Sequence, residues 1–254
     1  MITSFWLALM FLTRVPAPTL GEVSDAHQRG VLYFFPFIGL LIGALMAVAL
    51  LLLPAAAMLN AALLVMFWVF VTGGLHIDGL GDSADGWLGG LGDKARTLEI
   101  MKDPRAGSAA VMTIACVLLV KFAALACLLA EAAVPLVVWA LLFAPTLGRC
   151  VPALLFFTTP YARTDGLASP MVAGANGARQ LVWVAVWLAM AVLSLVWLAG
   201  FTSLGLWVGL AVQLWLLRRL MCQRLGGVTG DTVGAAVEIT EMSSLVLLAY
   251  LAVA

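Results

Sequence analysis

The stretch Thr72–Gly90, TGGLHIDGLGDSADGWLGG, carries the residues around which the rest of this chain has to be arranged. It holds three aspartates, seven glycines and one of the chain's two histidines, in a chain that is otherwise mostly apolar. Asp78, Asp82 and Asp85 are spaced i, i+4 and i+7, so on a helix their carboxylates share one face, about one turn apart. Carboxylates inside or beside membrane helices are costly and mark functional sites. The stretch therefore predicts a functional site built on a helix.

The composition of the whole chain is that of an integral membrane protein. Of its 254 residues, 64% are hydrophobic and 10% are charged, whereas soluble domains are about 25% charged. The net charge of zero gives no general attraction to nucleic acid, and we expect no nucleic-acid partner. The four cysteines are scattered singly, which predicts neither a disulfide framework nor a cysteine metal site. We expect one all-α domain, residues 1–254, built as a polytopic membrane helix bundle.

Apolar runs predict seven membrane spans, with an error of one. A span takes about 20 residues, so Met1–Leu12 is too short and is expected to form an interfacial or re-entrant helix. The second and sixth predicted spans are short, and a locally thinned bilayer would accommodate them. The predicted spans are about Leu32–Leu53, Asn60–Leu75, Ser108–Glu131, Pro135–Phe157, Gln180–Ala199, Phe201–Trp215 and Gly234–Ala254.

Charge placement predicts how these spans are oriented. With the N-terminus inside, eleven of the thirteen Lys and Arg residues fall in inner segments and the outer turns hold none, as the positive-inside rule requires. We therefore expect a cytoplasmic N-terminus. The other two cations, Lys121 and Arg149, lie inside spans, where a cation pairs with a carboxylate or a substrate phosphate. Lys121 lies deeper, which favours an ion pair or snorkelling. The inner segments are 1–31, 73–107, 158–179 and 216–233.

The aspartate face has the chemistry of a site for a hard divalent cation. Mg²⁺ in particular is held by one or two carboxylates together with substrate phosphate oxygens. A solvated helix face beside a glycine-rich turn is the plainer interpretation, but such a face would mix Lys with Glu, and Asp is a poor helix former. His76 points away from the aspartate face if the helix already runs there. At a helix start it would act as a base or a phosphate ligand, and a purely structural histidine is the alternative.

Three other polar segments lie on the same predicted side of the membrane. Lys102–Gly107, KDPRAG, would form a phosphate clamp before a helix start, although ordinary positive-inside anchors explain it nearly as well. Arg163-Thr164-Asp165-Gly166 follows the fourth span. Gly226–Asp231, GGVTGD, is a glycine-rich loop that is able to cradle phosphate or help hold a second metal. Glu238 and Glu241 follow it on one helix face.

Acidic, glycine-rich and basic segments on one side of the membrane favour metal-assisted phosphoryl transfer. That reaction needs metal ions to neutralise a diphosphate, cations on its oxygens and a group that orients the attacking hydroxyl. A channel or transporter would instead place isolated charges at the bilayer midplane, often in repeated halves. The sequence shows no such repeat.

At these residues the chain resembles the cobalamin synthase family, whose members are also called adenosylcobinamide-GDP ribazoletransferase or cobalamin-5′-phosphate synthase. The resemblance runs nearly end to end, and the run TGGLHIDGL-x-D-x-x-DG is highly specific. The matching blocks are FLTRVPAP, FPFIGLLIG, TGGLHIDGLGDSADG, LEIMKDPRAGS, YAR-x-DGL and GGVTGDTVGAAVEITE.

The resemblance implies a transferase of cobalamin biosynthesis. In that family a hydroxyl of α-ribazole, or of its 5′-phosphate, attacks the phosphate attached to cobinamide in adenosylcobinamide-GDP, and GMP leaves. The product is adenosylcobalamin or its 5′-phosphate, and Mg²⁺ is required. We accordingly expect a protein of the bacterial inner membrane, in contact with membrane lipid, whose active face is cytoplasmic. The resemblance is compatible with a homo-oligomer or with an association with other cobalamin-assembly enzymes.

The resemblance also suggests roles for individual residues. His76 would orient or deprotonate the incoming hydroxyl, and Asp82 is expected to be essential for catalysis. Mg²⁺ would be held against the diphosphate by Asp78, Asp82 and Asp85. Phosphate charge would be neutralised by Lys102, Arg105 and Arg149. Further substrate contacts are expected from Arg163, Asp165, Thr229 and Gly230, and a second metal or nucleoside site from Asp231, Glu238 and Glu241.

Two alternatives remain open on the sequence. A CDP-alcohol phosphotransferase of lipid synthesis shares the D-x-x-D-G opening at Asp82-Ser-Ala-Asp85-Gly86, but Leu88-Gly89-Gly90 does not supply the Ala-Arg that should follow in register. A transporter or passive membrane scaffold would bind ligand without releasing GMP and without depending on Mg²⁺.

Overall fold

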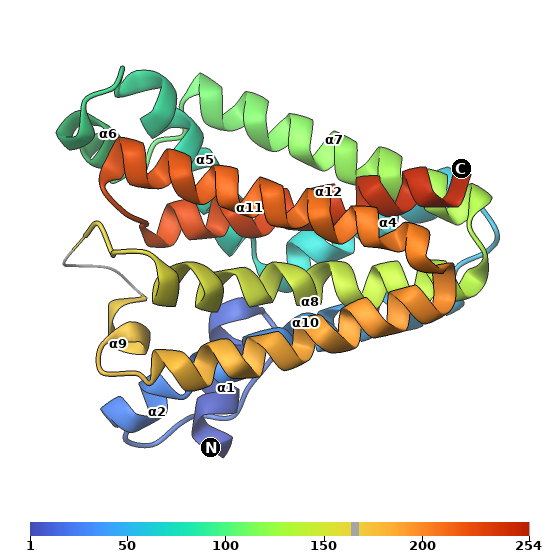
Figure 1. Cartoon of the computed structure of the whole chain (residues 1–254), viewed down its shortest axis with the longest axis horizontal. Coiled ribbons are helices and arrows are strands. Elements are labelled where there is room, and N and C mark those ends of the chain that lie inside the picture. The colour runs from blue at the N-terminus through green and yellow to red at the C-terminus, as the bar shows by residue number, and fades with distance from the viewer. Residues whose placement is uncertain (164–167, 254) are drawn as a thin grey trace.

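Long apolar runs form the helices of this chain, and they lie side by side as a bundle in the computed structural model (Figure 1). The structure describes residues 1–163 and 168–253, and these residues contain helices and one isolated β-bridge but no strand. Two short 3₁₀ turns, Val31–Phe34 and Phe201–Ser203, precede α3 and α11. The helices are α1 (Ile2–Leu12), α2 (Asp25–Arg29), α3 (Phe35–Leu51), α4 (Ala57–Thr72), α5 (Leu75–Gly89), α6 (Lys94–Ile100), α7 (Ser108–Glu131), α8 (Val134–Thr158), α9 (Ser169–Val172), α10 (Gly177–Ala199), α11 (Leu204–Leu225) and α12 (Gly230–Val253).

The predicted membrane helix bundle is confirmed. Within the described residues six helices are long and apolar enough to cross a bilayer, and the bent pair α4–α5 raises the number to as many as seven. The short first helix is also present, as predicted. The sixth span was drawn too short, because α11 continues to Leu225 rather than ending at Trp215. Helical hydrogen bonding carries on past the point where arginines end the apolar run, and left-handed Gly226 (φ 73°) then stops it.

The acidic stretch forms a helix of the bundle, α5. The predicted second span, Asn60–Leu75, ends at Thr72, because Gly73 and Gly74 both adopt left-handed conformations (φ 65° and 72°) that glycine tolerates best. After this break α5 runs at 90° to α4 and packs between α7 and α12. The prediction that the three aspartates lie on one helix is confirmed, since α5 covers all of them.

Close contact between α3 and α8 forms the centre of the bundle. Helix α8 is largely buried and also packs against α10 and α12. Gly39 and Gly43 lie one turn apart on α3, where a Cβ atom on either would overlap backbone atoms of α8 at Pro145 or Leu141. Small residues at this spacing let two membrane helices approach closely, so van der Waals packing holds the pair together in an apolar environment.

The two ends of the bundle differ in chemistry. The longer polar connections, 90–107, 159–163, 168–176 and 226–229, gather at one end, on the left in Figure 1. The short turns 52–56, 132–133 and 200–203 lie at the other end with the C-terminus. The segments predicted to be cytoplasmic therefore share one end, and the assignment of that end to the cytoplasm stays a prediction.

The glycine contact between α3 and α8 can be tested by substitution. Gly43→Val places methyl groups against the α8 backbone, and overpacking of this kind costs about 1–3 kcal/mol. We expect the apparent melting temperature in detergent to fall by at least about 3 °C. Gly205→Val is the control, because a Cβ at Gly205 on α11 meets open space. Equal melting temperatures for the two variants would contradict this account of the packing.

Candidate active site

Two loops that are far apart in the sequence are joined at the polar end of the bundle. The amide of Ala162 donates to the carbonyl of Val228 (2.8 Å), and the amide of Val228 donates to the carbonyl of Pro160 (2.9 Å). Tyr161 and Val228 thus form a parallel β-bridge. Gly227 is required beside it, since a Cβ atom there would overlap the Pro160 carbonyl. The bridge holds the segment carrying Arg163 against the start of α12.

The start of α12 is held by its own side chains. Thr229 and Thr232 exchange hydrogen bonds, with the Thr232 amide donating to the Thr229 hydroxyl (3.2 Å) and the Thr229 amide donating to the Thr232 hydroxyl (2.9 Å). Thr229, predicted to contact substrate, is fully buried, and its hydroxyl instead caps the N-terminus of α12. Gly230 begins the helix beside open space. Asp231 follows it, and its Oδ2 atom forms an ion pair with Nη1 of Arg163 at 2.8 Å.

Helix α5 lies directly against this end of α12. A Cβ atom on Gly79 would sit 2.8 Å from the Asp231 carbonyl oxygen, and one on Gly234 would sit 3.4 Å from Cα of His76. The close approach brings the half-buried Asp82 within electrostatic range of Asp78, Asp231 and Arg163. Carboxylates predicted from separate parts of the sequence, on α5 and on α12, therefore meet at one place.

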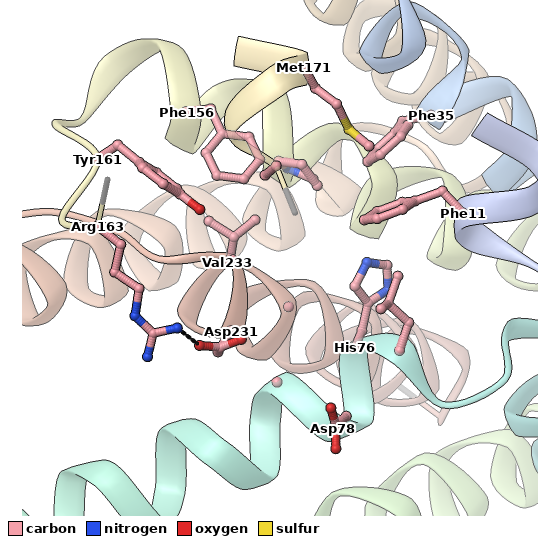
Figure 2. Close-up of a pocket in the computed structure, with 16 residues that line it drawn as sticks. Phe11, Phe35, His76, Asp78, Phe156, Tyr161, Arg163, Met171, Asp231 and Val233 are labelled. Atoms are coloured by element: carbon pink, nitrogen blue, oxygen red, sulfur yellow. Dashed lines mark hydrogen bonds and ion pairs between the residues drawn. The ribbon is translucent and has the colours of Figure 1, made fainter. Parts of the chain in front are cut away.

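A cavity of about 260 Å³ opens where α5, α12 and the Arg163 segment meet (Figure 2). Its polar lining comes from His76, Asp78, Tyr161, Arg163 and Asp231. Figure 2 shows the His76 imidazole pointing toward Phe11 and the Asp78 carboxylate pointing to the opposite side of α5, as their spacing predicted. The apolar lining includes Phe11, Phe35, Phe156 and Met171. A volume of this size suits phosphate groups and part of a larger ligand.

The third aspartate of α5 has a different set of partners. Asp85 accepts hydrogen bonds from the backbone amides of Gly107 (2.6 Å) and Ala110 (3.0 Å). It thus caps the N-terminus of α7, where a negative charge also meets the positive end of the helix dipole. Among the described residues no three His, Cys, Asp or Glu side chains form a ready-made metal centre.

The predicted phosphate clamp before α7 lies outside the cavity. Lys102 and Arg105 are exposed, and neither lines the cavity between α5 and α12. Nη2 of Arg105 pairs with Oδ2 of Asp103 at 2.7 Å. The hydrogen bonds that the side chain and the backbone amide of Arg105 donate lower the pKa of Asp103 to about 2. Asp165, which was predicted to contact substrate from the loop after the fourth span, lies outside the described residues.

A second charge cluster is buried deeper in the bundle. Nζ of Lys121 on α7 lies 2.6 Å from carboxylate oxygens of both Glu238 and Glu241 on α12, and Arg149 on α8 contacts Glu241. All four side chains are at most 5% exposed. The ion pair favoured for Lys121 is therefore confirmed. Arg149, Glu238 and Glu241, predicted to contact phosphate or metal, are instead engaged in the ion pairs of this cluster, and none lines the cavity.

Sequence reasoning missed the aromatic part of the cavity. Tyr161 lines it beside Arg163, and its partial burial raises the pKa of its hydroxyl. The YAR-x-DGL block contains Tyr161, but only its charged residues were selected. Phe11 and Phe35 come from the first two matching blocks, FLTRVPAP and FPFIGLLIG. The first block was read as the end of the short N-terminal helix and the second as part of a membrane span, so only their tertiary position shows that they reach the site.

The fold and the site together define a polytopic helical membrane protein with carboxylates and an arginine around a cavity at one end of its bundle. The chain belongs to the cobalamin-5-phosphate synthase family, whose sequence model matches residues 4–249. It is 47% identical to the adenosylcobinamide-GDP ribazoletransferase of Pseudomonas entomophila (strain L48), over 97% of this chain and 98% of that protein. The enzyme of the same name from Acinetobacter baumannii (strain ATCC 17978) is 42% identical, over 94% of each chain. No solved structure matches the chain.

The buried cluster makes a prediction for stability. Lys121→Met leaves Glu238 unpaired in the interior, and breaking a buried ion pair in this way costs about 3–5 kcal/mol. We expect the apparent melting temperature in detergent to fall by at least about 6 °C. The double variant Lys121→Met/Glu238→Gln should recover much of the loss, because Glu241 keeps Arg149 as its partner.

Lys94→Met is the matched control for this measurement, because Lys94 is exposed on α6. A double variant that melts no higher than Lys121→Met would show that charge balance does not explain the cluster.

Proposed function

We propose that this chain is an adenosylcobinamide-GDP ribazoletransferase that joins adenosylcobinamide-GDP to α-ribazole or its 5′-phosphate. The observation that carries the proposal is the meeting of Asp78, Asp231 and Arg163 around one cavity. It occurs in a chain that matches, over nearly its full length, relatives named for this activity. Carboxylates and an arginine at a cavity are the groups that phosphoryl transfer requires.

The proposed reaction replaces a phosphoanhydride bond of the diphosphate by a phosphate ester bond to the acceptor. A hydroxyl oxygen of the acceptor forms a bond to the phosphorus attached to cobinamide, and the bond from that phosphorus to the bridging oxygen of GMP breaks. The hydroxyl proton passes to a base or to solvent, and GMP leaves with the bond electrons. The products are adenosylcobalamin, or its 5′-phosphate, and GMP.

The residues at the cavity fit a magnesium-assisted form of this reaction. One or two carboxylates would hold Mg²⁺, and substrate phosphate oxygens would complete its coordination. The candidates are Asp78 and Asp231, which line the cavity, and Asp82, which lies one turn after Asp78 on α5. The described residues hold no ready-made group of three metal-ligating side chains, so substrate phosphate oxygens would have to supply the rest of the coordination. Bound there, Mg²⁺ supplies positive charge to the diphosphate. We leave Asp85, Glu238 and Glu241 out of this set because none of them lines the cavity. Both oxygens of Asp85 cap α7, and the two glutamates are buried in ion pairs.

The chain's own cation and amide groups complete the proposed phosphate site. Arg163 is held by Asp231 and lines the cavity, where its guanidinium would bind phosphate oxygens in a fork. Gly230 presents the N-terminus of the long helix α12 to the same space, and that end favours anions. His76 is buried, and its Nδ1 atom has no hydrogen-bond partner among the described residues. We assign to His76 the orientation or deprotonation of the attacking hydroxyl.

The site would work at the cytoplasmic surface of the inner membrane. The cavity lies at the end of the bundle that carries the cation-rich connections, and the positive-inside rule assigns that end to the cytoplasm. A water-soluble nucleotide substrate would reach the cavity from that side.

The activity can be measured directly on purified protein in detergent or liposomes. Adenosylcobinamide-GDP and α-ribazole are supplied with and without Mg²⁺, and GMP release is followed together with the mass of the corrinoid product. We expect GMP release and a complete cobalamin only when Mg²⁺ is present. CMP release from a CDP-alcohol with a lipid acceptor, and none from the cobinamide substrate, would move the chain to the CDP-alcohol phosphotransferases. Ligand binding without turnover would favour a transporter or scaffold.

Asp82 tests the carboxylate set. Asp82→Ala should lower GMP release at least about 100-fold, since removing one preorganised electrostatic group from an active site typically costs that much. Membrane insertion and the melting temperature should stay close to wild type. Glu99→Ala is the control, because Glu99 is an exposed carboxylate on α6 at the same end of the bundle. Wild-type turnover by Asp82→Ala would refute the metal assignment.

A further inference from the structure

A second cavity lies beside the proposed active site and shares a wall with it. Its volume is about 540 Å³, and it lies between the end of α1, the Gly73–Gly74 bend and the start of α5. Phe11, Leu75 and Asp78 line both cavities. The rest of the second lining is Met10, Thr13, Arg14, Thr72, Gly73, Gly74, Ile77 and Ile114.

Arg14 is the cation of this second cavity, and the fold places it there by two contacts. Its backbone amide donates to the Val71 carbonyl (2.7 Å), which ties the segment after α1 to the end of α4. Its side chain lies across Gly73, where a Cβ atom would overlap Nε of Arg14. The left-handed glycine at the bend (φ 65°) therefore also makes room for the guanidinium.

The charges of the cavity leave Arg14 available to a ligand. The side chain is exposed, and among the described residues it forms neither an ion pair nor a hydrogen bond. The cavity's other charged lining residue is Asp78, which also faces the first cavity. A guanidinium held in a concave site binds phosphate strongly because its planar fork matches the phosphate oxygens.

We propose that the second cavity seats the acceptor nucleoside and that Arg14 binds its 5′-phosphate. The inference rests on the proposed function and adds to it a separate place for the second substrate. Transfer needs two substrates side by side, and both carry phosphate when the acceptor is α-ribazole 5′-phosphate. The described residues form two adjoining cavities, each lined by one arginine, Arg163 or Arg14. The first is too small for both ligands, whereas about 540 Å³ is an ordinary volume for a nucleotide-sized ligand. The shared Asp78 then lies where the acceptor hydroxyl meets the donor phosphate.

The test compares two acceptors that differ only in the phosphate. Purified full-length wild type, Arg14→Ala and Arg14→Lys are assayed in a neutral detergent with Mg²⁺ and adenosylcobinamide-GDP, and GMP release is followed. With Arg14→Ala we expect the KM for α-ribazole 5′-phosphate to rise about tenfold or more, as loss of a charge-assisted hydrogen bond predicts. The KM for unphosphorylated α-ribazole and for adenosylcobinamide-GDP should change by less than about threefold. Arg14→Lys should show an intermediate KM for the phosphorylated acceptor, because it keeps the charge and loses the fork.

Arg179→Ala is the matched control, since Arg179 is an exposed arginine on α10 on the same predicted side of the membrane. Equal losses with both acceptors, or a rise in KM for adenosylcobinamide-GDP, would overturn the assignment. The same holds for a defect that appears only in vesicles containing phosphatidylglycerol and not in neutral detergent, because Arg14 would then bind a lipid phosphate.

A direct binding measurement separates this inference from the proposed function. If wild type releases no GMP with either acceptor, the proposed function fails. Calorimetric titration of α-ribazole 5′-phosphate into wild type and Arg14→Ala then decides the inference by itself. Binding to wild type that weakens about tenfold in Arg14→Ala supports it. Equal binding by the two proteins, or no binding to wild type, refutes it.

Discussion

The site depends on how closely α5 and α12 approach each other. Gly79 on α5 meets the backbone of Asp231 on α12, and Gly234 on α12 meets the backbone of His76 on α5. A side chain at Gly79 would push the two helices apart and separate the carboxylates they carry, whereas a Cβ atom at Gly234 would make ordinary contact with His76. The bend at Gly73–Gly74 is the second half of the same constraint, because it turns α5 by 90° and directs it between α7 and α12.

The two charge clusters differ in net charge and in exposure to solvent. The buried cluster has two cations and two carboxylates, so its charges balance where no water can solvate them. The cavity cluster has more carboxylates than cations and lies at the polar end of the bundle, where the Asp231 side chain is partly exposed to solvent. Helix α12 belongs to both, since Asp231 lies at its first turn and Glu238 follows about 10 Å deeper. One helix thus anchors the bundle and supplies the site.

The sequence predicted the aspartate helix and most of the spans because those patterns are local. Ser108–Glu131 was placed at both ends, since its long apolar run is bounded by glycine on one side and by the turn before Pro135 on the other. The segment 73–107 was assigned to the inner side of the membrane rather than to a span, because three aspartates and many glycines lower its hydropathy. In the structure those glycines serve helix packing, which no hydropathy average detects.

Membrane class, helical content and the identity of the acidic residues were determined by the sequence itself, because composition, periodicity and spacing are properties of the chain alone. Only the tertiary structure decided which charges act together. Glu238 and Glu241 look like site residues in sequence, yet Lys121 and Arg149 bind them in the interior. Arg14 and Tyr161 looked ordinary, yet both line cavities beside Asp78. The partner of a charge is set by distance in space, and helices far apart in sequence determine that distance only when they pack.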